Sequence, residues 1–260
     1  MAEELLNQIE AYWSTRPEGY SEVNEKELAG EQKRAWLSVL EEHFPAGEKR
    51  KMKILDVGTG PGFFPVILAR AGYAVTAVDY TPGMLKKAGE NLKKYAGDRA
   101  GEVTLLRMDA QDLSFADETF DVVLSRNLTW NLENPEQAYR EWYRVLKPGG
   151  ILLNFDANWY GYLYDGEKRK AYEQDRVNVE KSALEDHYLC TDIDAMEKIA
   201  LQVPLSRIGR PDWDRRVLEE TGFQGIRTDE DIWQRLWSRE EKLNYGSTPL
   251  FLICAGKGEE

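Results

Sequence analysis

Short apolar runs alternate with longer helix-like segments along much of the chain. The runs have the length and composition of buried strands, whereas the segments between them repeat apolar residues at helical spacing. Such alternation is typical of parallel strands joined by helices, and it predicts an α/β fold with a doubly wound sheet. The predicted strands of this region are residues 54–57, 74–79, 103–111, 120–127 and 151–156.

The chain continues beyond this alternation with a long connection. Residues 159–212 follow the last of these strands, exceed the usual length of a loop and contain helix-like stretches at 166–186 and 192–202. We therefore expect them to form a cap. A further helix is predicted at 213–222, and two more strands are predicted at 225–232 and 249–256.

The residues before the first strand have a helical pattern of their own. One amphipathic helix is followed by a turn-like stretch at 16–24 and by a second predicted helix at 27–44. We therefore expect the chain to consist of an N-terminal helical region at 1–50 and an α/β domain at 51–260, and we expect the cap to belong to the α/β domain.

The connection between the first predicted strand and the next helix is rich in glycine. Gly58, Gly60 and Gly62 allow a tight turn and a close approach of a ligand to the backbone, because no Cβ atom stands in the way. A turn of this kind after a parallel strand is typical of sites for nucleotide-like ligands. The dinucleotide pattern G-x-G-x-x-G fails because Phe63 occupies its third glycine position. The P-loop pattern fails because no Gly-Lys-Ser/Thr follows.

Two motifs carry a resemblance to a known family. Asp56 to Gly62, Asp-Val-Gly-Thr-Gly-Pro-Gly, resembles the D-x-G-x-G-x-G loop of class I S-adenosylmethionine-dependent methyltransferases. Arg144 to Gly150, Arg-Val-Leu-Lys-Pro-Gly-Gly, resembles the turn into that family's fifth strand. The resemblance covers residues 52 to about 156 and is to methyltransferases of small metabolites, the type that includes enzymes of ubiquinone and menaquinone biosynthesis.

The resemblance implies a fold, a cofactor and an activity. The fold is a Rossmann-like mixed sheet of seven strands, with an N-terminal helical lid over the cofactor and a helical cap inserted after strand five. The cofactor is S-adenosylmethionine, and its product is S-adenosylhomocysteine. The activity is methyl transfer to an N, O or S atom of a small molecule, mainly through positioning. A non-catalytic sensor or partner protein that binds S-adenosylmethionine is the alternative.

Acidic residues end the second and third predicted strands. Asp79 stands where a carboxylate can accept two hydrogen bonds from a ribose diol, although capping of the next helix is an alternative. The resemblance implies that Asp109 binds the adenine amino group beside the backbone N–H of Ala110, and Asp112 competes for this role. It also implies cofactor contacts from Tyr20, toward the methionine carboxylate, and from Asp56, Gly58, Thr59, Gly60, Tyr80, Met84 and Asn127.

Aromatic residues follow the fourth and fifth predicted strands. Trp130, Trp159 and Tyr160 are expected to line the acceptor pocket, and packing between cap and sheet is the alternative. Asp156 and His187 are candidate bases, which methyl transfer needs only where the acceptor must lose a proton. His187 could instead be structural, and Asp156 could instead pair with an amine. Ring faces and acidic groups together favour an amine acceptor, while oxygen and sulfur acceptors stay open.

The composition of the chain disfavours several classes of binding partner. The chain has 260 residues and a formal net charge of −12, which disfavours nucleic acid as a partner. No apolar run approaches the length of a membrane span, and the acidic N-terminus argues against a secretory or mitochondrial signal. The two cysteines, Cys190 and Cys254, stand far apart, so we expect a cytoplasmic protein. No metal-ligand spacing is present, and no metal is expected.

Overall fold

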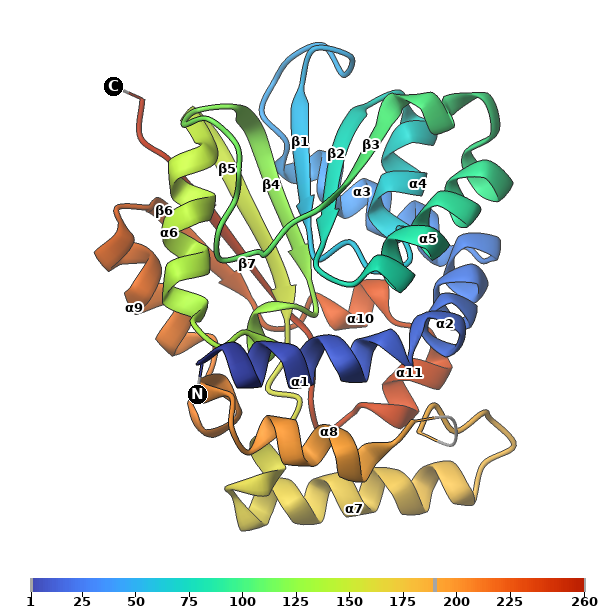
Figure 1. Ribbon diagram of the computed structural model, residues 1–260. Helices are drawn as coiled ribbons and strands as arrows, with labels where there is room; N and C mark the ends of the chain where they lie inside the picture. The colour runs from blue at the N-terminus through green and yellow to red at the C-terminus, as the bar shows by residue number, and fades with distance from the viewer. Residues whose placement is uncertain (1, 189–190, 260) are drawn as a thin grey trace.

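A seven-stranded mixed sheet lies at the centre of the computed structural model, which describes residues 2–188 and 191–259 (Figure 1). Cys190 lies outside the described residues. The strand order is β3-β2-β1-β4-β5-β7-β6, and only β7 runs antiparallel to its two neighbours. The predicted doubly wound, Rossmann-like fold is confirmed. The strands are β1 (Lys53–Val57), β2 (Ala74–Asp79), β3 (Val103–Arg107), β4 (Phe120–Arg126), β5 (Leu146–Asp156), β6 (Gln224–Asp229) and β7 (Phe251–Gly256).

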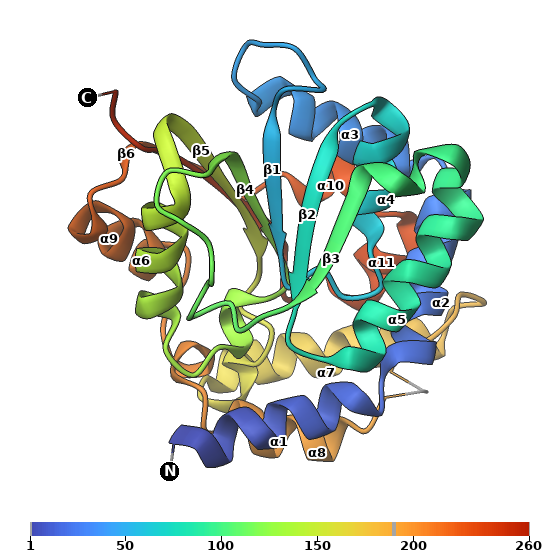
Figure 2. The ribbon, with the colours of Figure 1, turned by 45° about the horizontal axis from the view of Figure 1, so that its top comes forward.

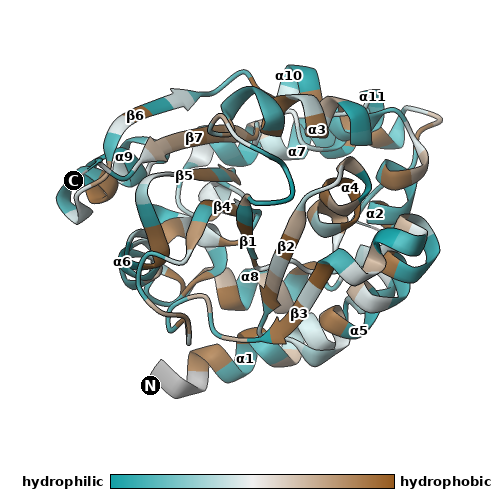
Figure 3. Cartoon of the chain, turned by 90° about the horizontal axis from the view of Figure 1, so that it is seen from above, coloured by the Kyte–Doolittle hydropathy of each residue, from teal (hydrophilic) through white to brown (hydrophobic). Residues whose placement is uncertain are grey.

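Helices cover both faces of the sheet (Figure 2). Side chains alternate along each strand, so Ile54 packs in the cluster under α3 (Gln32–His43) and α4 (Phe63–Ala71), while Leu55 packs under α6 (Pro135–Val145) and α9 (Asp212–Thr221). Figure 3 shows hydrophobic stretches on the central strands and on α4, as burial on both faces requires. Between β2 and β3 lie α5 (Pro82–Asn91), η1 (Leu92–Ala96) and η2 (Gly97–Glu102), and η3 (Thr129–Asn131) follows the carboxyl end of β4.

Three further helices lie beyond the carboxyl ends of the parallel strands (Figure 1). They are α1 (Ala2–Ser14), α7 (Gly166–Glu180) and α8 (Ile193–Ala200). Leu5 and Ile9 of α1 pack with Met196 and Ile199 of α8 in a hydrophobic cluster separate from the two core clusters. Helices α1 and α8 therefore share one small core at this edge of the sheet. Two short 3₁₀ helices, η4 (Gly161–Leu163) and η5 (Pro204–Arg207), precede α7 and follow α8 in the chain.

The predicted bounds differ from the structure in several places. The helix predicted at 166–186 ends at Glu180, and the strand predicted at 151–156 begins at Leu146. The turn-like stretch at 16–24 belongs to helix α2 (Pro17–Ala29), because Pro17 occupies a first-turn position where its missing N–H costs little. The helix predicted at 27–44 is broken at Gly30, where the backbone is extended. Strand β3 ends at Arg107, and Asp109 forms only an isolated bridge with Asp112.

Two helices between β6 and β7 were missed by sequence reasoning. They are α10 (Trp233–Leu236) and α11 (Arg239–Asn244). A sequence signal existed for the second: Ser238 and Glu241 form a capping box, the S-x-x-E pattern of a helix start. No helix among the described residues is long and apolar enough to cross a membrane.

Candidate cofactor and acceptor cavities

The glycine turn after β1 has the backbone that glycine permits. Gly58, Gly60 and Gly62 have φ values of 70°, 53° and 88°. A Cβ atom on Gly58 would lie 2.7 Å from Cδ2 of Leu128, so a side chain there would force Leu128 to shift and would also strain the backbone at this positive φ. The neighbouring Asp79 carboxylate accepts hydrogen bonds from the backbone N–H of Gly60 and of Thr81, both at 2.8 Å. Asp79 thus holds the turn, and each of its oxygens retains a lone pair for a ligand.

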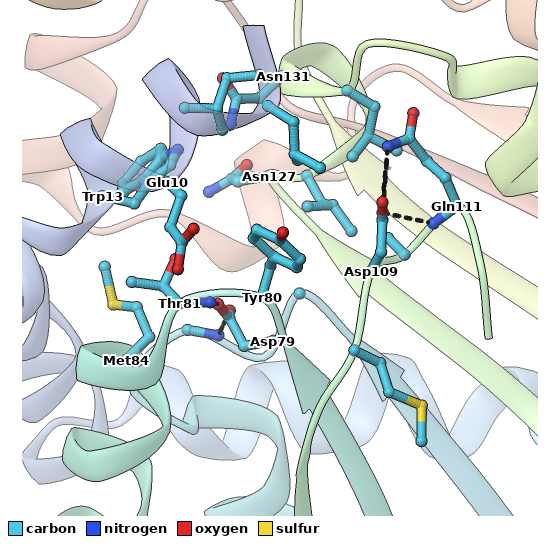
Figure 4. A pocket seen from close by; sticks show the side chains of 18 of the residues that line it. Glu10, Trp13, Asp79, Tyr80, Thr81, Met84, Asp109, Gln111, Asn127 and Asn131 are labelled. Carbon is cyan, nitrogen blue, oxygen red and sulfur yellow. Dashed lines mark hydrogen bonds between the residues drawn. The ribbon is translucent and has the colours of Figure 1, made fainter. Parts of the chain in front are cut away.

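A cavity of about 810 Å³ lies at the carboxyl ends of β1 to β4 (Figure 4). Among the residues predicted to bind a cofactor, its lining includes Tyr20, Gly58, Gly60, Asp79, Tyr80, Met84, Asp109, Ala110 and Asn127. Helix α1 closes one side with Glu10 and Trp13. Arg107 donates to Glu10 at 2.7 Å and to the carbonyl of Tyr80 at 2.9 Å, which ties α1 to the end of β3.

The other two predicted cofactor residues, Asp56 and Thr59, line an adjoining space of about 320 Å³. Burial raises the pKa of Asp56 to about 7, the hydrogen bond from Thr59 opposes this rise, and the charge of Asp79 adds to it. Tyr20 and Arg126 line the same space. The glycine turn therefore borders both the 810 Å³ cavity and this adjoining space.

The two carboxylates after β3 differ in position. Asp109 lines the 810 Å³ cavity and accepts from the backbone N–H of Gln111 at 2.9 Å, which orients the carboxylate. Asp112 is exposed and lies outside the cavity's described lining. Of the two, only Asp109 faces the space that a cofactor would occupy.

A second cavity, of about 1040 Å³, adjoins the first and is mainly aromatic. Half of its described lining is tryptophan or tyrosine: Tyr12, Trp13, Tyr20, Trp130, Trp159, Tyr160, Tyr188, Trp237 and Tyr245. The three aromatic residues predicted for an acceptor pocket are therefore together here. Four residues line both cavities, namely Trp13, Tyr20, Arg126 and Asn127.

Sequence reasoning missed Arg126, which lines all three spaces. Its guanidinium binds Glu27 of α2 through two hydrogen bonds, at 2.7 and 3.2 Å, and stacks over the Trp36 ring at 4.4 Å. The pair is almost completely buried. Glu27 and Trp36 come from the N-terminal helices, so no local pattern around the end of β4 could have revealed this partner.

The two candidate bases have partners of their own. Asp156 is fully buried and accepts hydrogen bonds from Arg210 at 2.6 Å and from the backbone N–H groups of Trp130 and Ala157. It does not belong to the described lining of either cavity, which corrects the expectation that it meets an acceptor. His187 does line the aromatic cavity, with its ring nitrogens 3.0 Å from the Tyr245 hydroxyl and 2.6 Å from a Glu240 carboxylate oxygen.

Comparisons with known proteins agree with this geometry. A family model described as a methyltransferase domain matches residues 55–154. A glycine/sarcosine N-methyltransferase of Aphanothece halophytica is 30% identical over 205 residues, which cover 76% of this chain and 73% of that protein. A solved structure of a putative S-adenosyl-L-methionine-dependent methyltransferase from Methanococcus maripaludis has a TM-score of 0.61 at 18% identity, and the match covers 95% of this chain and 94% of that one.

The match to the Aphanothece protein decides the family, because it extends over most of both chains. The chain belongs to the class I S-adenosylmethionine-dependent methyltransferases. An uncharacterized methyltransferase of Mycobacterium avium is 34% identical over 108 residues, but the match spans only 40% of that protein. The chain thus covers about two-fifths of the length of such mycobacterial relatives.

The residues of this methyltransferase fit the family's cofactor. Three of the ten buried polar side-chain atoms that lack a hydrogen-bond partner among the described residues belong to residues that line the 810 Å³ cavity: Arg126 Nε, Asn127 Oδ1 and Asn131 Oδ1. A buried polar atom without a partner is costly, so these three atoms favour a polar ligand in this cavity. Asn127 also has a φ of 55°, a conformation that non-glycine residues seldom adopt.

Proposed function

We propose that this protein transfers the methyl group of S-adenosylmethionine to the nitrogen of a small amine. One observation carries the proposal: the cavity at the strand ends and the aromatic cavity share Trp13, Tyr20, Arg126 and Asn127. A methyl donor in the first cavity and an acceptor in the second would meet at this shared wall. Holding two reactants in line is the main contribution that such a transfer needs from a protein.

The residues at the strand ends supply a site for each part of the cofactor. Asp79 would accept hydrogen bonds from the ribose diol, and Asp109 would accept one from the adenine amino group beside the N–H of Ala110. The glycine turn, with Tyr20, would hold the methionine end. These roles extend the expectations from the sequence, with Tyr80 and Met84 as further walls of the cavity.

The amine acceptor is supported by the aromatic lining. Ring faces attract cations, and an alkylated amine is cationic after methylation, or before it when protonated. Trp130 and Tyr160 lie with ring centroids 5.0 Å apart, and Trp13 and Tyr20 at 5.7 Å. The Aphanothece relative is named for glycine and sarcosine, which are small amines.

The reaction itself needs few groups. Bound S-adenosylmethionine supplies a methyl group on a positively charged sulfur; the nitrogen lone pair forms the new C–N bond, and the electrons of the C–S bond pass to sulfur. The amine proton leaves to water, directly or through a base in the cavity wall. Asp156 is not proposed as a base, because Arg210 holds it in the interior. His187 remains a candidate for proton removal, since its ring lies in the wall of the aromatic cavity.

The helices beyond the strand ends suit the predicted lid and cap. We propose that residues 1–50 act as a lid over the cofactor and that residues 159–212 form a cap over the acceptor. Trp13 comes from the first region, and Trp159 and Tyr160 begin the second. Glu241 of α11 and Tyr245, which directly follows this helix, complete the pocket, so the acceptor site also depends on a segment outside the predicted cap.

A transfer assay tests the proposal. The protein is incubated with S-adenosylmethionine labelled in its methyl group and with N-methylethanolamine, sarcosine, ethylene glycol or 2-mercaptoethanol. We expect label in at least one amine product and none in the products of the alcohol or the thiol. Binding of S-adenosylmethionine without transfer to any amine would contradict the proposal and favour a sensor, and transfer to the thiol alone would move the acceptor atom to sulfur.

A further inference from the structure

Three side chains form a hydrogen-bonded chain that starts in the wall of the aromatic cavity. His187 lies between α7 and α8, Glu240 lies on α11, and Tyr245 directly follows α11. His187 Nδ1 is 3.0 Å from the Tyr245 hydroxyl, and its Nε2 is 2.6 Å from a Glu240 carboxylate oxygen. His187 and Tyr245 line the cavity, whereas Glu240 is not part of its described lining. The chain therefore leads from the cavity, through the imidazole ring, to a carboxylate outside that lining.

The two partners of His187 decide where its protons lie. An ionised carboxylate can only accept, so the neutral ring carries its proton on Nε2 and donates to Glu240. Nδ1 is then an acceptor and takes the hydrogen bond of the Tyr245 hydroxyl. Burial raises the pKa of Tyr245 well above its ordinary range, so this phenol keeps its proton. Its oxygen retains lone pairs that can accept a hydrogen bond from a ligand in the cavity.

Packing holds the ends of this chain in place. The Tyr245 ring lies edge-on to the Trp159 ring, with centroids 5.4 Å apart, and 5.8 Å from the Trp237 ring. The backbone N–H of His187 donates to Asn244 Oδ1 at 3.1 Å, which fixes this part of the cap region to α11. The Tyr245 hydroxyl is thus held in one position beside the space that an acceptor would occupy.

Charged residues around His187 come from several elements. Besides Glu240, they are Lys26 and Glu27 on α2, Arg176 on α7, Glu185 and Asp186 just before His187, Glu241 on α11, and Arg16 and Arg126 in the cavity wall. Lys26 pairs with Glu185, and Arg176 pairs with Asp186. Glu240 binds the ring itself and can balance the positive charge of a protonated imidazole.

We propose that Tyr245 and His187 remove the proton of the bound amine, with Tyr245 touching the nitrogen and Glu240 positioning His187. The proposal rests on the proposed function, in which the acceptor is an amine. An alkylamine, like a lysine side chain, is mostly protonated at neutral pH, and a protonated nitrogen has no lone pair for attack on a methyl group. A base that accepts this proton within the cavity supplies the reactive form of the acceptor.

The proton would move in two linked transfers. The N–H bond breaks toward the Tyr245 oxygen while the hydroxyl proton passes to Nδ1 of His187, so the tyrosine stays neutral. The nitrogen keeps the electron pair of the broken bond, and this pair forms the new C–N bond. The imidazole ring then gives its proton to water; the Glu240 side chain at its far nitrogen is 28% exposed, which places solvent within reach.

Two variants test the chain, each with a matched control. Tyr245→Phe removes only the hydroxyl, and His187→Asn keeps an oxygen that can accept from Tyr245 but takes no proton. The controls are Tyr95→Phe and His43→Asn, because each loses a hydrogen bond of 2.8 Å outside the described lining of both cavities. All four variants should bind S-adenosylhomocysteine with unchanged affinity in calorimetry, which also shows that they are folded.

The measurement is kcat/KM at pH 7 and at about pH 9.5, with methyl-labelled S-adenosylmethionine and with N-methylethanolamine and sarcosine as acceptors. At pH 7 we expect Tyr245→Phe and His187→Asn to lower kcat/KM about 100-fold, the scale of general-base catalysis, and the controls to keep the wild-type value. The deficit should shrink to less than about tenfold near pH 9.5, where the unprotonated fraction of an alkylamine is roughly 300 times larger than at pH 7.

A purely structural role predicts a different pattern. A deficit of the same size at both pH values would mean that the two residues only shape the pocket and would overturn the inference, as would wild-type rates in either variant at pH 7. If one variant fails to bind S-adenosylhomocysteine, the other decides. A wild-type protein that binds S-adenosylhomocysteine but methylates neither amine would instead overturn the proposed function.

Discussion

The Arg210 guanidinium binds the Asp156 carboxylate at 2.6 Å, and both side chains are completely buried. Arg210 also donates to Asp214 at 2.7 and 2.8 Å, so one cation joins the end of β5 to helix α9. A carboxylate held this way is part of the fold. Asp156 was a candidate base because it ends a strand at the catalytic edge of the sheet. In the structure it instead binds Arg210 and so holds the segment before α9 against β5.

Replacing Asp156 should therefore affect stability and leave acceptor binding unchanged. Asp156→Ala leaves the Arg210 charge buried with one partner fewer, and we expect the free energy of unfolding to fall by about 3–5 kcal/mol in urea titrations. Asp212→Ala is the control, because Asp212 pairs with Arg215 on the surface. A variant of normal stability that has lost affinity for the amine would contradict this account.

Asp79 should matter for cofactor affinity. Asp79→Ala removes an acceptor for the ribose diol, and its expected cost is about 1–3 kcal/mol of binding free energy for S-adenosylhomocysteine, measured by calorimetry. Loss of stability with unchanged affinity would favour the alternative, in which Asp79 only holds the Gly60 and Thr81 backbone.

The two carboxylates after β3 should behave differently. Asp109→Ala is expected to weaken S-adenosylhomocysteine binding by about 1–2 kcal/mol through a lost hydrogen bond to adenine. Asp112→Ala should leave the affinity unchanged, because this exposed side chain lies outside the cavity's described lining. The opposite ranking in calorimetry would transfer the adenine role to Asp112.

Gly58 should tolerate a side chain poorly. Gly58→Ala combines a positive φ with a Cβ atom 2.7 Å from Leu128, whereas Gly72→Ala also has a positive φ, in the left-handed region, and nothing within 4 Å. We expect Gly72→Ala to cost about 1–2 kcal/mol of stability from backbone strain alone. Gly58→Ala should cost more and should also weaken S-adenosylhomocysteine binding. Equal effects of the two changes on both quantities would mean that the close approach at Gly58 is unimportant.

Local sequence patterns were sufficient to predict most of the core. They did not predict the cavity residues whose partners are distant in sequence. Ile54 and Leu55 lie on opposite faces as the strand period requires, and the turn at Gly58 follows from its own sequence. Arg126 escaped attention because its partner Glu27 lies in α2, which is distant in sequence.

The walls of the aromatic cavity show the same limit. Trp159 was expected there from its place after β5, whereas Tyr188 and Tyr245 come from segments whose docking no periodicity specifies. Asp156 was misjudged because its partner, Arg210, lies beyond the whole cap. Pairings across long insertions are fixed by tertiary packing, which a single sequence pattern does not encode.

The Asp56 carboxyl should make stability depend on pH. Its pKa in the folded protein is raised to about 7 by burial, from 3.8 in the ordinary state, so the folded protein binds the proton more tightly than the unfolded chain. The stabilising contribution is present below about pH 4 and is lost as the pH rises toward 7. Asp56→Asn should remove this decline. Parallel pH profiles of unfolding free energy for the two proteins would contradict the assignment.

The most direct test of the account is calorimetric titration of the purified protein with S-adenosylhomocysteine, with NAD as the control ligand. Because the cavity at the strand ends is assigned to the cofactor of this family, we predict saturable binding of S-adenosylhomocysteine in the micromolar range and none of NAD. Binding of NAD, with no binding of S-adenosylhomocysteine, would contradict the account.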